Sequence, residues 1–178
     1  MTAVEELTQH LLEISRKHDL ERDGVKRKAT DLTRRSQAFV AIVEAALSTP
    51  RNAKVLSHVR VVRMMVLTQG ALSVELELTG IKVQVAGMEL DFTPEIQHQD
   101  GVSSLQVIVR SGLDDRMTIT EGTDGGWHLR LPGAETTVPA DEEAIARLLL
   151  NRIRQTPSAR SQSFSHTPYL SFAHRSHR

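Results

Sequence analysis

Residues 73–92 read SVELELTGIKVQVAGMELDF, and this stretch decides the fold class of the chain. From Ser73 to Leu78 polar and apolar residues alternate strictly, which is typical of a strand with one buried face. The pairs Thr79-Gly80 and Ala86-Gly87 interrupt the alternation as tight turns do. The stretch therefore predicts three antiparallel strands in a meander that has one apolar and one solvated face.

The same alternation continues on both sides of this stretch. Upstream, residues 58–67 (HVRVVRMMVL) are more apolar, which predicts a strand near the centre of the sheet. Downstream, we expect strands near 105–109, 117–120 and 127–131, with one longer loop near 94–104. The sequence thus predicts about seven strands. Six glycines are expected to supply the positive φ that their turns need: Gly70, Gly80, Gly87, Gly112, Gly125 and Gly126.

The first fifty residues have helical periodicity instead. A first apolar stripe is formed by Val4, Leu7, Leu11 and Ile14, and a second runs from Val25 to Leu47. Gly24 weakens a helix by about 1 kcal/mol relative to alanine, and a polar segment precedes it. We therefore expect a pair of helices with a break or bend at Gly24. The two helices would form a hairpin, or each would pair in a dimeric coiled coil with a second copy.

A last helix is expected from near Pro139, a residue suited to the first helical turn. Its acidic start and basic end match the helix dipole, and its apolar stripe would cover the sheet. After Pro157 the sequence has no acid and no periodicity, which predicts a disordered tail. The predicted fold class is α+β, with a helical segment at 1–50, a β domain at 51–138, a helix at 139–156 and a tail at 157–178.

Catalytic and cofactor signatures are absent from the sequence, so we expect a non-enzymatic protein without a cofactor. The chain has no cysteine, which excludes disulfides, thiolate metal sites and a cysteine nucleophile. None of the common phosphate-loop, dinucleotide, serine-hydrolase or zinc-protease motifs occurs. His98 and Asp100 alone are too few to bind zinc. The carboxylate pairs Glu75 with Glu77 and Glu89 with Asp91 are expected on the solvated face of the sheet.

Charge is distributed unevenly although the net charge is zero. Counting lysine and arginine against aspartate and glutamate, residues 1–63 hold 12 and 8, residues 64–143 hold 4 and 14, and residues 144–178 hold 6 and 0. The three segments thus carry +4, −10 and +6. This pattern predicts an acidic sheet between two basic flanks, and it indicates a charged partner or self-association.

The basic flanks favour binding to DNA or RNA, because arginines with interleaved aromatics neutralise phosphates and stack on bases. The alternative is a protein-interaction adaptor or chaperone-like assembly factor that does not bind nucleic acid. Without a secretion signal or a membrane span in the sequence, we expect a cytoplasmic protein. The predicted nucleic-acid-binding residues are Lys26, Arg27, Lys28, Arg34, Arg35, Arg51, Lys54, Arg154, Arg160, Tyr169, Arg175 and Arg178.

Overall fold

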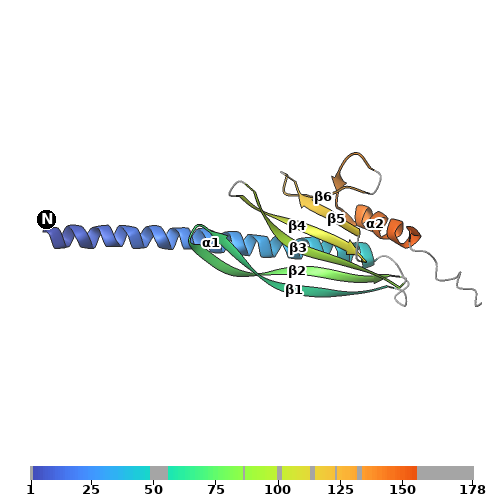
Figure 1. Ribbon diagram of the computed structural model, residues 1–178, viewed down its shortest axis with the longest axis horizontal. Coiled ribbons are helices and arrows are strands. Elements are labelled where there is room, and N and C mark those ends of the chain that lie inside the picture. Colours follow the sequence, from blue (N-terminus) through green and yellow to red (C-terminus); the bar gives the residue numbers. More distant parts are fainter. Residues whose placement is uncertain are drawn as a thin grey trace, which may run out of the picture.

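The computed structural model of the chain combines one long helix, one antiparallel sheet and a short C-terminal helix (Figure 1). It describes residues 2–48, 56–85, 87–99, 102–112, 115–122, 124–131 and 134–155. The predicted α+β class is confirmed. The elements are α1 (Ala3–Ser48), β1 (Leu56–Gln69), β2 (Leu72–Val85), β3 (Met88–Gln99), β4 (Val102–Ser111), β5 (Asp115–Glu121), β6 (Trp127–Leu129), β7 (Val138–Pro139) and α2 (Glu142–Gln155).

The sheet is a meander in which the spatial order of the seven strands follows the chain, and every neighbouring pair is antiparallel. Four of the six expected glycines do have positive φ: Gly70, Gly87, Gly112 and Gly125. The prediction of about seven strands in a meander is therefore correct. Two of the predicted boundaries are wrong, however.

The predicted turn at Thr79-Gly80 does not exist, because β2 runs straight through it from Leu72 to Val85. Gly80 has another role. A Cβ on Gly80 would lie 2.5 Å from the Phe92 carbonyl oxygen, so only glycine allows β3 to approach here. The predicted loop near 94–104 is also wrong, since β3 and β4 continue as a paired hairpin to Gln99 and Val102.

The strand predicted to be central, β1, is an edge strand that pairs only with β2. Its apolar side chains lie on both faces of the strand, and only some of them are buried. Leu67 is buried, whereas Val59, Met64 and Val66 are more than half exposed. Apolar content alone therefore misplaced this strand, because the hydrophobic residues on its outer side are not covered.

The predicted helix pair is one uninterrupted helix of 46 residues, about 70 Å long. Gly24 lies inside it, and nothing lies within 4 Å of the position that its Cβ would take. A cost of about 1 kcal/mol does not break a helix that contains no proline and whose next turn is docked on the sheet from Val25 onward. Figure 1 shows that the C-terminal half of α1 lies along the sheet and the N-terminal half extends beyond it.

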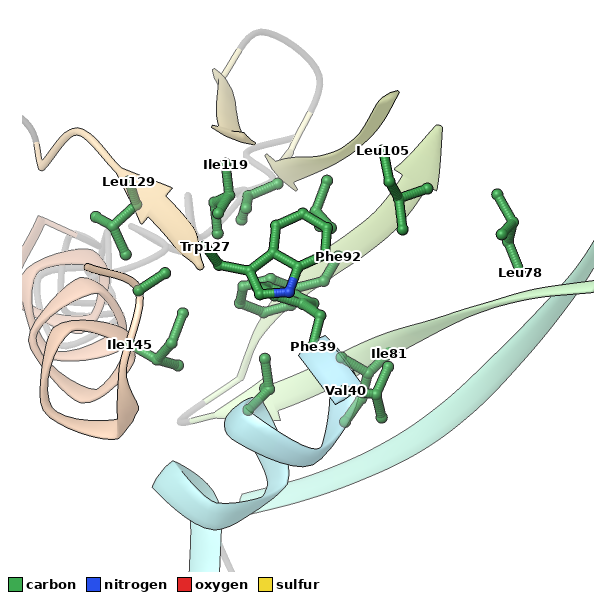
Figure 2. Packing of buried hydrophobic residues seen from close by; sticks show 14 of the residues in the cluster. Phe39, Val40, Leu78, Ile81, Phe92, Leu105, Ile119, Trp127, Leu129 and Ile145 are labelled. Carbon is green, nitrogen blue, oxygen red and sulfur yellow. The ribbon is translucent and has the colours of Figure 1, made fainter. Parts of the chain in front are cut away.

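The core lies between α1, α2 and one face of the sheet, and its aromatic centre is shown in Figure 2. Phe39 of α1 packs edge-on against Trp127 of β6, with ring centroids 5.0 Å apart, and lies 6.1 Å from Phe92 of β3. Leu129 and Ile145 close the core from the side of α2.

The predicted C-terminal helix is present and its buried residues join the core, but it packs mainly against α1, and it begins at Glu142 and not near Pro139, which belongs to β7. Asp141 caps it, since its carboxylate accepts a hydrogen bond of 2.8 Å from the Ala144 amide. Within the described residues, no helix is both long and apolar enough to cross a membrane. The predicted tail lies outside the described residues.

Candidate interaction surfaces

The C-terminal half of α1, residues 25–47, is the docked half and is fixed to the sheet along its length. Its buried stripe includes Val25, Leu32 and Val43. Polar links between α1 and the first two strands, β1 and β2, occur at three levels. They are the bond from Lys28 Nζ to Gln69 Oε1 (2.9 Å), the bond from the Thr79 amide to Ser36 Oγ (3.1 Å) and the paired bonds from Arg60 to the Glu44 carboxylate (2.7 and 2.6 Å).

The tip of the β1–β2 hairpin is the part of the sheet that contacts α1 nearest to the N-terminus of the helix. β2 pairs with β3 only from Ile81 to Val85, so the remainder of the hairpin leaves the sheet as a two-stranded ribbon and follows the helix. Before Thr79 the buried residues of β2 have even numbers, and after Gly80 they have odd numbers. The pairing of β2 with β1 continues through this change, so the opposite face of the strand becomes buried. The strong twist of a two-stranded ribbon thus turns its other side to α1. At the tip, a groove is lined by His18, Glu21, Gly24, Val25, Lys28, Gln69, Gly70, Ala71 and Leu72.

Beyond this tip, residues 3–23 form a projecting arm in which every residue is exposed. Its N-terminus is a capping box, since the Thr2 amide donates to Glu5 and the Glu5 amide donates to Thr2 Oγ1. Large apolar side chains on the arm have exposed fractions between 47% and 73%. They are Val4, Leu7, Leu11, Leu12, Ile14 and Leu20. The docked half begins at Val25, so the basic residues from 26 to 35 lie beside the sheet and do not belong to the arm.

Arg35 is an internal structural residue and not a surface arginine. Its guanidinium binds the Glu121 carboxylate on β5, whose side chain is only 9% exposed, and also binds Asp31 at 2.8 Å. The hydrogen bond that Arg35 donates to the Glu121 carboxylate raises the pKa of Arg35. Asp31 also accepts a 2.6 Å bond from Arg34, which lowers the pKa of Asp31. The helical periodicity of the sequence could not reveal this role of Arg35, because Glu121 lies 86 residues away in the sequence.

The structure brings only part of the predicted nucleic-acid-binding set together. Lys26, Arg27 and Arg34 line one shallow hollow on the side of α1 that faces away from the sheet. Lys28 is bonded to Gln69, and Arg154 lies in the last turn of α2, at the opposite end of the docked half. The other predicted residues lie outside the described residues: Arg51, Lys54, Arg160, Tyr169, Arg175 and Arg178.

The outer face of the sheet carries acids as expected, but several of them pair with bases on the next strand or on the strand after it. Asp91 lies 3.8 Å from Arg63, Glu89 lies 3.4 Å from Lys82, and Glu95 lies 3.5 Å from Arg110 and 3.7 Å from Arg116. This face is therefore a ladder of opposite charges more than a uniform acidic surface. Sequence counting could not show it, because the partners come from different strands.

Known protein families, curated proteins and solved structures contain no match to this chain. Nor do three or more histidine, aspartate or glutamate side chains gather at a possible metal site in the part of the chain that the structure describes. The features that remain for a functional argument are the projecting arm and the basic hollow on α1.

Proposed function

We propose that this chain is a non-enzymatic protein-interaction module, in which the sheet and α2 hold α1 and the projecting arm binds a protein partner. The observation that carries the proposal is the complete exposure of residues 3–23. Four of the exposed apolar residues lie on one side of the arm at 3-4-3 spacing, namely Val4, Leu7, Leu11 and Ile14. An amphipathic helix with this spacing is the form in which helices enter a groove or pair with another helix.

Two further features of the arm support a binding role. Contiguous exposed apolar surface mostly marks an interaction site in soluble proteins. In addition, a helix of about 20 residues is only marginally stable in water by itself. Here the capping box between Thr2 and Glu5 stabilises the free end, and the docked half continues the helix from the other end. The sequence thus supports a helix at a place where, among the described residues, only its last turns at His18 and Glu21 approach the sheet.

Binding of nucleic acid is the second candidate, and the basic hollow favours it. The charged groups of Lys26 and Arg27 form no ion pair with any side chain among the described residues, and Arg34 is 77% exposed although it is paired with Asp31. Phosphates could therefore reach these three side chains along the outer side of α1. The acids Asp23 and Asp31 line the same hollow and would oppose a phosphate, which makes this candidate the weaker one.

The experiment that separates the two candidates is affinity capture with the full chain before and after nuclease treatment. Leu11→Glu disrupts the apolar side of the arm, and Leu20→Glu is the matched control because Leu20 lies on the opposite side of the same helix. A stoichiometric protein captured by the Leu20→Glu variant but not by Leu11→Glu supports the proposal. If nuclease removes every captured protein, and duplex DNA binds with a steep salt dependence, the second candidate replaces it.

A further inference from the structure

We infer that the partner of the projecting arm is a second copy of this chain, and that the two arms pair side by side in antiparallel orientation. This inference rests on the proposed function and names the partner for the same surface. The contact would be made by the apolar side of the arm, that is by Val4, Leu7, Leu11 and Ile14 of both copies.

The orientation follows from the position of the apolar side relative to the sheet. Successive residues of an α-helix are rotated by about 100° around its axis. By this rotation, the apolar side of the arm and the buried stripe that begins at Val25 point in directions that differ by less than about 30° around the axis of α1. The arm therefore presents its apolar residues on the side of α1 that the β1–β2 hairpin covers further along. A partner helix on that side is in line with the hairpin tip at Gly70.

A parallel partner is excluded by this arrangement. Packed helices have axes about 8–10 Å apart, so a parallel second α1 would continue directly into the tip at Gly70 and Ala71. An antiparallel partner avoids this collision. The capped start of its α1, at Thr2, points toward the tip, while its own sheet lies beyond the far end of the first arm.

The length of the arm fits one antiparallel register closely. If Leu7 faces the partner's Leu11, then Val4 faces the partner's Ile14, and all four layers of the contact are apolar. In this register the twofold axis lies beside residue 9, and Thr2, which caps one α1, lies opposite residue 16 of the other. The overlap of the two described helices therefore lies before His18, where the groove at the hairpin tip begins.

The charges along the arm favour the same orientation. Residues 3–15 contain three glutamates and no lysine or arginine, whereas residues 16–28 contain six bases and three acids. In the register above, Arg16 lies opposite the partner's Thr2, about one helical turn from its Glu5, and Glu13 opposite Glu5 is the one like-charged position that faces across the contact. Parallel pairing would instead place like charges beside each other, which is unfavourable.

The other exposed apolar surface, the edge strand β1, is less suited to a second copy. Antiparallel pairing of two β1 strands would bring Arg60 and Arg63 of one copy next to the same two arginines of the other. Both arginines are also held by acids of their own chain, Glu44 and Asp91. Charged side chains of this kind are a common protection of sheet edges against pairing.

The first test is sedimentation of the purified full chain from about 1 µM to about 500 µM, a range that covers weak and moderate dimers. We expect a concentration-dependent shift to twice the mass of the 178-residue chain. Leu11→Glu should raise the dissociation constant at least about a hundredfold, because a dimer loses two buried leucines and gains two charges. Leu20→Glu should leave it unchanged, and circular dichroism should show equal helix content in both variants.

The second test fixes the orientation and uses the absence of cysteine from the chain. In an antiparallel dimer, Val4→Cys and Ile14→Cys form an intermolecular disulfide when the two variants are mixed, and neither does so alone. Disulfides in the separate variants would refute the antiparallel arrangement. A chain that stays monomeric at every concentration would refute self-pairing, and if it still captures another protein through Leu11, the proposed function survives that failure.

Discussion

Replacing Ser36 with alanine tests how α1 is held to the sheet at the point where β2 leaves β3. Ser36 is 1% exposed, and its hydroxyl accepts a 3.1 Å hydrogen bond from the Thr79 amide while it donates to the Thr33 carbonyl. Without the hydroxyl, the amide of Thr79 stays buried without a partner, which costs about 1–3 kcal/mol. Alanine recovers about 0.5 kcal/mol through its higher helix propensity. We therefore expect the free energy of unfolding to fall by about 1–2 kcal/mol.

Urea denaturation followed by fluorescence measures this change, because the single tryptophan, Trp127, lies in the core against Phe39. In a chain of this size, a loss of 1–2 kcal/mol lowers the melting temperature by roughly 2–8 °C. Ser48→Ala is the matched control, since Ser48 makes the same local bond to a carbonyl three residues earlier and is exposed. If both variants unfold at the same urea concentration as the unchanged chain, Thr79 does not depend on Ser36 and the reasoning fails.

Three other substitutions test single features of the structure. Gly80→Ala should lower the free energy of unfolding by about 1–3 kcal/mol in urea, because the new methyl group would lie 2.5 Å from the Phe92 carbonyl oxygen; an unchanged midpoint would show that the strands separate freely here. Gly24→Ala should do the opposite, since nothing obstructs its Cβ, and should slow hydrogen exchange in the arm about fivefold; equal exchange rates would contradict a continuous stable helix. Hydrogen bonds from Arg60 lower the pKa of Glu44 in the folded chain. The ionised carboxylate therefore stabilises the fold at pH values above its unfolded pKa of about 4.3. This stabilisation is lost as the pH falls through the lower pKa of the folded state. Glu44→Gln should therefore be less stable at pH 7 and lose less stability between about pH 5 and 3, as measured by thermal melts, and parallel curves would refute the link.

The periodicity of the sequence was sufficient for the kind of elements and for the order of the meander, because alternation depends on burial of one face. It could not locate Gly80 correctly. The dipeptide Thr79-Gly80 has the composition of a turn, but glycine is required there by the carbonyl of Phe92, which is distant in the sequence. In the same way, the apolar residues of β1 could not show that only one side of the strand is covered.

The candidate site was predicted less completely than the fold. Helical spacing identified the stripe of Val4, Leu7, Leu11 and Ile14, and it remains the basis of the proposed function. Spacing could not show that this stripe is exposed while the one after Gly24 is buried, since both have the same pattern. Nor could it separate Arg35, which binds Glu121 on a distant strand, from Arg27, which forms no such ion pair.

The contact between Phe39 and Trp127 has a consequence for how the chain is made. The two residues are 88 positions apart, and the helix that carries Phe39 is synthesised before any strand. At 5–20 residues per second, a ribosome needs about 4–18 s to reach Trp127 after Phe39 has been added. Until β2 (Leu72–Val85) has also been made, the docked half of α1 has no sheet to cover it. The nascent chain therefore exposes a second apolar stripe in line with that of the arm, and its protection from premature association must come from outside the chain.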